Sequence, residues 1–260
     1  MVALSEKKLQ QLKLILDQKA NMFNAPSFIE HDPILIPHQF TNKADIEITA
    51  FIMSTIAWGN RKAILKSGEN LLRVMEYKPL EFVLNTSEKE LVNTHFIHRT
   101  FNAEDFNFFI QRLALHYKKN KSLETMFGGE SFKGNLRERL ILFKNLFFQE
   151  QHLTRTEKHI SSPLKNSACK RLNMFLRWMV RKDNKGVDFG IWNSISTREL
   201  MVPLDVHTGN SARKLGLLAR KQNDWHALEE LMFTLRKWRP HDPAWYDYAL
   251  FGLGIESGKK

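Results

Sequence analysis

Two short segments carry residues whose types suit nucleophilic catalysis. Lys170 lies at the predicted start of a helix, and Asp205 lies in a Val-Pro-Leu-Asp-Val-His-Thr segment that leads into another helix. A lysine amine can attack an electrophilic carbon, and a nearby carboxylate can stabilise positive charge that develops there. If the fold brings the two helix starts together, the pair predicts covalent catalysis on a substrate that becomes cationic.

Both residues also have an ordinary structural interpretation. Asp205 directly precedes a helix predicted from Val206, so its carboxylate can serve as an N-cap, a role that is compatible with catalysis. Lys170 can be a solvated lysine in a basic helix. A lysine nucleophile must be uncharged when it attacks, and Arg171 supplies a neighbouring cation that favours the neutral amine.

The two segments resemble motifs of the helix-hairpin-helix DNA glycosylases of base-excision repair. Residues 164–170 (LKNSACK) are similar to the hairpin and nucleophile motif of that superfamily, and residues 203–207 (PLDVH) to its aspartate motif, nearest the 8-oxoguanine glycosylase branch. Residues 243–251 resemble the final helix of that branch, and residues 52–61 resemble an early helix and its DNA-facing loop. An uncharacterised bacterial subgroup of the superfamily looks nearer overall.

This resemblance implies an all-α, two-lobed fold with a cleft between the lobes. One helical lobe would span residues 60–181 and end in the hairpin and the Lys170 helix. Residues 1–59 and 200–260 would form the second lobe, and residues 182–199 would be an insertion that lines or decorates the cleft. Lys170 and Asp205 are then expected on opposite lips of that cleft.

The activity implied by the resemblance is that of a DNA glycosylase with associated lyase chemistry. An oxidised or otherwise damaged purine would be flipped out of duplex DNA, because its glycosidic carbon cannot be reached inside the stack. Lys170 would attack that carbon and Asp205 would stabilise the cationic sugar; strand cleavage by elimination could follow. No metal or organic cofactor is expected, and a single cysteine cannot supply the four thiolates of the iron-sulfur cluster that many relatives hold.

Contacts to DNA are implied for three groups of polar and basic residues. They are the loop residues Asn60 and Arg61, the hairpin and its flank (Asn166, Ser167, Ala168, Arg171), and His207 together with the basic cluster Arg236, Lys237 and Arg239. Each group can equally be solvated surface. Asn166 and Ala168 stand where the superfamily hairpin carries glycines; asparagine tolerates a left-handed backbone, whereas alanine is a poorer substitute.

Composition limits the classes of partner and compartment. The chain has 260 residues, a formal net charge of +11 and one cysteine. An excess of positive charge favours an anionic partner, since phosphate neutralisation releases counterions. One cysteine excludes an internal disulfide framework. The sequence contains no apolar run of about 18 residues that would suggest a membrane span. We therefore expect a monomeric cytoplasmic, nucleoid-associated protein that binds duplex DNA containing a damaged or abasic site and no membrane.

Helical periodicity runs along almost the whole chain, and strand-like alternation is nearly absent. Helices are predicted over 4–18, 44–57, 63–75, 104–117, 136–148, 170–181, 206–218, 225–238 and 244–253. Phenylalanine is abundant, at 19 residues, and its helical spacing at Phe106 and Phe109 with Leu113 indicates core packing rather than a base-stacking platform.

Two other function classes remain open. A non-catalytic DNA- or RNA-binding protein that retains the fold would account for the missing hairpin glycines. A helical protein-interaction module would make Lys170 an ordinary surface residue, with the net charge serving solubility.

Overall fold

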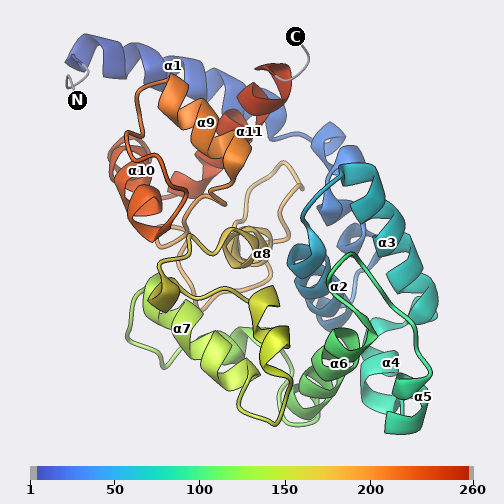
Figure 1. Cartoon of the computed structure of the whole chain (residues 1–260). Helices are drawn as coiled ribbons and strands as arrows, with labels where there is room; N and C mark the ends of the chain where they lie inside the picture. Colours follow the sequence, from blue (N-terminus) through green and yellow to red (C-terminus); the bar gives the residue numbers. More distant parts are fainter. Residues whose placement is uncertain (1–4, 258–260) are drawn as a thin grey trace. The chain divides into compact units, whose positions relative to one another are not determined.

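The computed structural model describes residues 5–257, which fold into helices joined by turns and loops (Figure 1). The α-helices are α1 (Glu6–Phe23), α2 (Lys43–Ile56), α3 (Arg61–Val74), α4 (Pro79–Asn85), α5 (Glu88–Val92), α6 (Ala103–Tyr117), α7 (Leu136–Phe147), α8 (Lys170–Val180), α9 (Val206–Lys214), α10 (Trp225–Trp238) and α11 (Tyr246–Ser257). Between residues 5 and 257, strand-type pairing consists of isolated bridges at His98–Phe101 and Ser167–Asp224. The predicted all-α class is confirmed. No helix in this described part of the chain is long and apolar enough to cross a membrane.

Short 3-10 helices occupy several of the connections. They are η1 (Pro26–His31), η2 (Pro33–Leu35), η3 (Pro37–Gln39), η4 (Leu123–Phe127), η5 (Thr154–His159), η6 (Pro163–Lys165) and η7 (Pro243–Trp245). Five of these begin at a proline, because proline has its φ preset for a helical turn and needs no N–H partner there. The predicted helix 244–253 accordingly starts as η7 and becomes α-helical only at Tyr246.

All the helices predicted from periodicity are found, although some bounds differ. Leu4, the predicted first residue of the first helix, lies outside the described residues. Helix α9 ends at Lys214 instead of residue 218 because Gly216 takes a left-handed φ of 75° and closes the helix end with the bonds Gly216 N–H to Arg213 O and Leu217 N–H to Ala212 O. Helices α4 and α5 were not predicted, since 7 and 5 residues are too few to show a period.

Helix starts coincide with capping side chains. Helices α5, α6 and α7 each begin with a reciprocal capping box, in which a serine or asparagine and an acidic residue three positions later bond each other's backbone N–H. Asn42 and Asn60 cap α2 and α3, and Asp205 and Asp224 cap α9 and α10. These caps fix the starts of the helices that carry or flank the predicted site.

The chain divides into two compact units, one formed by residues 1–28 with 162–260 and the other by residues 29–161. These boundaries differ from those expected from the sequence, because α2 packs with α3 and α4 whereas α8 is tied by ion pairs to α11. Lys170 and Asp205 therefore belong to the same unit.

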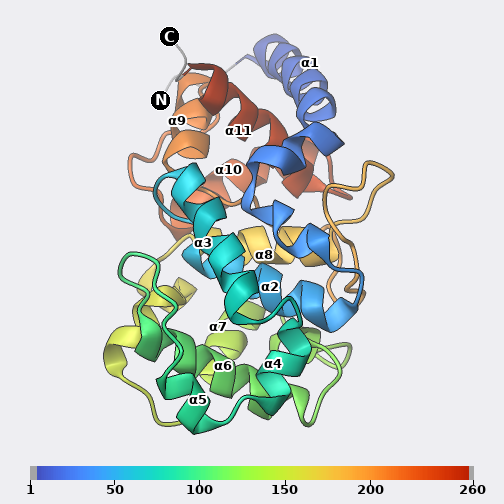
Figure 2. The same cartoon turned by 90° about the vertical axis from the view of Figure 1, so that its right-hand side faces the viewer.

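The unit of residues 29–161 has an aromatic core. Helix α2 is buried on nearly every side, and Phe51 on this helix contacts the rings of Phe109, Phe143 and Phe147 at 5.3–5.6 Å between centroids. Helix α6 lies beside α4 and α5 (Figure 2). Phe106, Phe109 and Leu113 are fully buried, which confirms that these residues pack the core.

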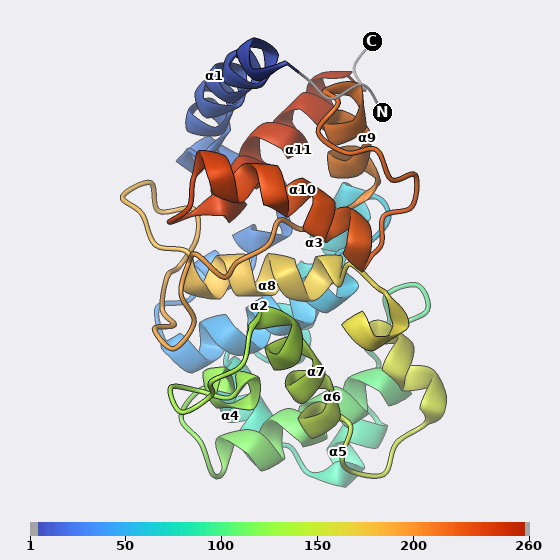
Figure 3. The same ribbon diagram turned by 90° about the vertical axis from the view of Figure 1, so that its left-hand side faces the viewer.

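The unit of residues 1–28 with 162–260 is built around α11. Helices α1 and α9 both pack against α11 (Figures 1 and 3). Gly252 allows a close approach here, because a Cβ at this position would lie 2.1 Å from the Phe23 ring of α1. Helix α11 thereby joins the chain's first helix to the helix that begins after Asp205.

Residues 182–199, expected as an insertion, contribute to the interior of this unit. Trp192 is buried against Phe175 of α8, and its backbone N–H bonds the Met179 carbonyl at the end of that helix. The Asp188 carboxylate accepts hydrogen bonds from the guanidinium groups of Arg177 and Arg181 at 3.2 and 3.0 Å. The segment therefore completes a buried ionic network and satisfies the last carbonyls of α8.

Candidate active site

The hairpin before α8 takes a left-handed conformation at two residues. Asn166 has φ 56° and ends η6, as the residue type tolerates, and Cys169 has φ 48° and precedes Lys170. Ala168, which stands at the second glycine position of the resemblance, keeps a negative φ and is buried. The left-handed turn that would require a glycine is thus displaced by one residue, to Cys169.

The two residues predicted to do chemistry are neighbours. Lys170 is the first residue of α8 and Asp205 is the N-cap of α9, and Lys170 Nζ lies 4.0 Å from Asp205 Oδ2. Both side chains are partly open to solvent, with exposed fractions of 30% and 24%. An amine and a carboxylate at this distance, accessible from outside, can act on the same atom of a bound substrate.

The two carboxylate oxygens of Asp205 have different neighbours. Oδ1 accepts a hydrogen bond from Thr208 N–H at 2.9 Å, which caps α9, while Oδ2 faces the lysine amine. The backbone carbonyl of Asp205 accepts from Gly209 N–H and from the side-chain amide of Asn223. The N-cap interpretation and the catalytic interpretation therefore apply to different atoms of one side chain.

The residues predicted to contact DNA fall in different parts of the chain. Arg171 follows Lys170 in α8, and burial lowers the pKa of its guanidinium from the ordinary arginine value. His207 is exposed in the first turn of α9, two residues after Asp205. Asn60 caps α3 by accepting from Ala63 N–H, and Arg61 opens that helix in the unit of residues 29–161.

The basic cluster lies at the far end of α10 from the hairpin. The start of α10 is bonded to the hairpin through Trp225 N–H and the Asn166 carbonyl at 3.0 Å (Figure 3). Arg236 is eleven residues further on, about 16 Å along the helix axis at 1.5 Å per residue. Lys237 is exposed and stacks on Phe233, while Arg239 covers the Trp245 ring and approaches Asp242. Arg239 thus has a structural role, whereas Lys237 is directed to solvent.

Ser167 and Asn166 pair with the segment that precedes α10. Asn166 Nδ2 donates to Asp224 Oδ2 at 3.0 Å, and Ser167 forms an isolated antiparallel bridge with Asp224. Arg220 also donates to the Asp224 carboxylate, and its hydrogen bonds hold the pKa of Asp224 well below the usual range of aspartate. Sequence reasoning did not single out Asn223 or Asp224; the available signal was an Asn-Asp pair directly before a predicted helix.

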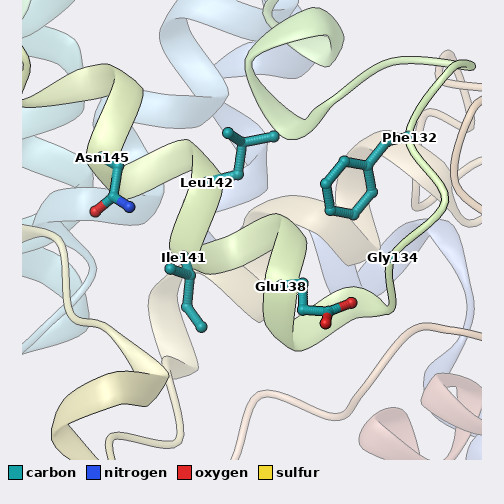
Figure 4. Close-up of a pocket in the computed structure, with 6 residues that line it drawn as sticks. All are labelled: Phe132, Gly134, Glu138, Ile141, Leu142 and Asn145. Carbon is teal, nitrogen blue, oxygen red and sulfur yellow. The ribbon is translucent and has the colours of Figure 1, made fainter.

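A separate shallow pocket lies on the outer face of α7 (Figure 4). It is lined by Phe132, Gly134, Glu138, Ile141, Leu142 and Asn145. Its carboxylate, Glu138, accepts from Asn135 N–H in the capping box of α7 at 2.8 Å. The pocket contains none of the predicted site residues, and its polar groups do not form a catalytic arrangement.

Groups of three or more histidine, cysteine or acidic side chains with the geometry to hold a metal ion are not found within residues 5–257.

Comparison with known proteins places the chain in one family. Residues 32–256 match the family model described as protein of unknown function DUF2400, and the chain belongs to this family. No curated protein and no solved structure matches the chain. The matched region includes Lys170, Asp205 and the Asn223–Asp224 pair.

Proposed function

We propose that this protein is a DNA glycosylase with associated lyase activity that acts on a damaged, oxidised purine flipped out of duplex DNA. The observation that carries the proposal is the 4.0 Å separation of Lys170 Nζ and Asp205 Oδ2, both open to solvent at the starts of two helices. The net charge of +11 supports an anionic polymer as substrate.

In this proposal the neutral Lys170 amine forms a bond to the sugar C1′, and the bond from C1′ to the base nitrogen breaks. The departing base takes the electron pair and is protonated. Asp205 stabilises the positive charge that develops on the sugar, and its Oδ2 can accept the proton that the lysine nitrogen releases. Opening of the sugar ring then breaks the C1′–O4′ bond, O4′ gains a proton, and C1′ becomes an imine carbon bonded to Lys170.

The hydrogen bond by which Asp205 caps α9 favours the catalytic role of its other carboxylate oxygen. Because Thr208 N–H holds Oδ1 at 2.9 Å, the carboxylate keeps one orientation with Oδ2 toward the amine. A carboxylate that is already oriented needs little reorganisation when charge develops nearby. The Lys170 amine is set by the left-handed Cys169, which turns the chain into α8 directly before it.

Borohydride trapping on abasic duplex DNA tests the proposal. Wild-type protein should yield a covalent adduct, because borohydride reduces the carbon-nitrogen double bond of the imine. Lys170→Gln should yield none, and Lys165→Gln, which changes an exposed lysine in the same hairpin, should trap like wild type. Trapping by Lys170→Gln at the wild-type level would place the nucleophile elsewhere.

A non-catalytic nucleic-acid-binding protein is the second candidate. It is favoured by Asn166 and Ala168, which replace both hairpin glycines of the resemblance. Such a protein would bind duplex DNA with an affinity that falls steeply as salt rises, yet form no adduct.

The third candidate is a helical interaction module. It is favoured by Leu14, Ile15 and Met22, which lie on the outer surface of α1 with exposed fractions of 62%, 45% and 62%. A protein of this kind would bind no duplex even at low salt, which separates it from the second candidate.

A further inference from the structure

The two segments that carry Lys170 and Asp205 are connected through a third segment, the residues directly before α10. Asn223 Nδ2 donates to the backbone carbonyl of Asp205 at 2.9 Å. The next residue, Asp224, accepts from Asn166 Nδ2 at 3.0 Å, and Trp225 N–H donates to the Asn166 carbonyl at 3.0 Å. Two adjacent side chains therefore hold the Asp205 segment on one side and the Lys170 hairpin on the other.

The connecting segment is itself fixed at both ends. Arg213 of α9 donates to Asn223 Oδ1 at 2.6 Å and to the Arg220 carbonyl at 2.8 Å. Glu230 of α10 accepts from the backbone N–H groups of Ala219 and Arg220. Because both helices restrain residues 219–224, the Asn223 amide is presented to Asp205 with little freedom.

We propose that Asn223 and Asp224 are positioning residues that together set the separation of the Lys170 amine and the Asp205 carboxylate. Because the two residues are adjacent in a segment that is restrained by Arg213 and Glu230, loss of one contact changes the placement of the other. Their side-chain bonds go to the segments that carry Asp205 and Lys170, and both act through the residues they hold. A role of this pair in catalysis rests on the proposed function, whereas its role in setting the distance between Lys170 and Asp205 does not.

Two substitutions interrupt the connection at opposite ends without disturbing the backbone. Asn223→Ala removes the amide that bonds the Asp205 carbonyl. Asn166→Gly removes the side chain that bonds Asp224 and suits the left-handed φ of 56° at this position, so the turn itself is retained. Glu230→Gln is the matched control, since it removes a charge next to the same segment but keeps a side-chain oxygen that can accept the 2.7 Å bond from Ala219 N–H, and so preserves the restraint.

The first measurement needs no DNA. Formaldehyde and borohydride methylate lysine amines through an imine, and mass spectrometry gives the rate at Lys170 relative to the exposed Lys165. Asp205→Asn should raise this ratio about two- to fivefold, the range expected when a partly exposed ion pair that engages the amine is removed. Asn223→Ala and Asn166→Gly should raise it in the same direction, and Glu230→Gln should leave it unchanged.

A double variant with Asp205→Asn tests whether Asn223 is a positioning residue. If Asn223 acts only by holding Asp205, the double variant Asn223→Ala with Asp205→Asn should match Asp205→Asn alone. A general loss of stability would instead alter all exposed lysines alike and leave the ratio unchanged. Additive effects of the two substitutions, or a wild-type ratio in Asn223→Ala, would overturn the proposal.

The second measurement is the single-turnover rate of adduct formation at saturating abasic duplex. Asn223→Ala should lower this rate at least tenfold with little change in the DNA concentration required for half saturation, because Asn223 orients reacting groups through Asp205. Asn166→Gly should also lower the rate, but its effect on DNA affinity is not diagnostic because Asn166 lies in the hairpin that is implied to contact DNA. A loss confined to DNA affinity would contradict positioning. If wild-type protein forms no adduct while the methylation ratios behave as expected, the positioning role is supported and the proposed function fails.

Discussion

The carboxylate of Asp205 faces two ways: Oδ1 receives Thr208 N–H at 2.9 Å and Oδ2 lies 4.0 Å from Lys170 Nζ. A helix N-cap usually stabilises only the helix that it starts. Here the cap bond orients the second oxygen toward an amine that comes from another helix start. The consequence is that the charge of Asp205 and its capping ability can be removed separately.

Substitution of Asp205 by asparagine or alanine should separate these two contributions. Asparagine caps helices about as well as aspartate, so Asp205→Asn should leave stability nearly unchanged while lowering base release at least about a hundredfold, the usual scale for removing one electrostatic stabiliser. Asp205→Ala should also lose about 1 kcal/mol of stability with the cap. Single-turnover base release and thermal melting measure the two effects.

The control for Asp205 is the cap of α2. Asn42→Asp exchanges the same two capping residue types in the unit of residues 29–161, and it should leave stability and base release nearly unchanged. Equal stability of Asp205→Asn and Asp205→Ala would show that the cap bond contributes nothing. Unchanged base release by Asp205→Asn would show that the charge of Asp205 does not contribute to the reaction.

Removal of the Asp188 charge should destabilise the unit that carries the site. Asp188 is buried, and its carboxylate bonds Arg177, Arg181 and the Tyr248 hydroxyl. Asp188→Asn removes the counterion that Arg177 and Arg181 share, while Arg177 keeps Asp247 and Arg181 keeps Asp183 and Asp242. The loss of charge-assisted hydrogen bonds should cost about 1.5–3 kcal/mol. Urea unfolding followed by the fluorescence of the buried Trp178 and Trp192 would measure the loss.

Lys185→Gln is the matched control for Asp188, because it changes an exposed charge in the same segment. It should alter the free energy of unfolding by less than about 0.5 kcal/mol. A small effect of Asp188→Asn, similar to this control, would mean that residues 182–199 decorate the unit instead of completing its interior.

The sequence was sufficient to predict most of the helices and to place Lys170 and Asp205 at the starts of two of them, because these features depend on local signals. Apolar spacing predicted α2 and α6, and the aspartate directly before Val206 located the cap of α9. Asp205 was identified by its neighbours in sequence. These features arise within one or two helical turns, where periodicity and capping preferences act.

Other features depended on contacts that no local pattern specifies. The buried role of Asp188 follows from Arg177, Arg181 and Tyr248, which lie in α8 and α11. The bond from Asn223 to the Asp205 carbonyl depends on Gly216, whose left-handed turn ends α9 and lets the chain return toward its start. Similarly, the division at residues 28 and 161 follows from helix packing and could not be inferred from composition.

We expect the free energy of unfolding to fall at alkaline pH because of Tyr117, which lies in the unit of residues 29–161. Burial, followed by the nearby Glu47 carboxylate, raises the pKa of Tyr117 well above its usual value of 10.0. The folded protein therefore keeps the phenolic proton at a pH where the unfolded chain releases it. The contribution is complete below pH 10 and declines by up to about 1.4 kcal/mol per pH unit above it. Unfolding free energies between pH 9 and 12 would show this slope.

Tyr117→Phe should reduce that alkaline slope and, at neutral pH, cost about 1 kcal/mol for the lost hydrogen bond to Glu47. Glu47 keeps bonds from Ser122 Oγ and Leu123 N–H in the variant. Tyr77→Phe removes an exposed phenol and serves as the control. An identical slope in wild type and Tyr117→Phe would assign the alkaline loss to other groups.

Charge reversal at Lys237 should test the predicted DNA contact of the basic cluster. Lys237 is exposed, so Lys237→Glu should weaken duplex binding, lower the salt dependence by roughly one unit of log-log slope and leave base preference unchanged. Arg239→Glu is less informative, since it also breaks the contact with Trp245 and places a second carboxylate near Asp242. Binding by Lys237→Glu equal to wild type across salt would place the DNA surface elsewhere.

Gly209→Ala should disturb the site from the opposite side of the Asn223 contact. Alanine favours a helix by about 1 kcal/mol over glycine, but its Cβ would lie 2.4 Å from Asn223 Oδ1 and 2.8 Å from Arg213 Nη1. Displacement of Asn223 loses its bonds to Asp205 and Arg213, which offsets the gain in helix propensity, so stability should change little. The methylation ratio of Lys170 to Lys165 should rise as it does in Asn223→Ala, whereas Asn210→Ala, an exposed position in the same helix, should leave it unchanged. A wild-type ratio in a folded Gly209→Ala protein would show that Asn223 does not control where the Asp205 carboxylate lies.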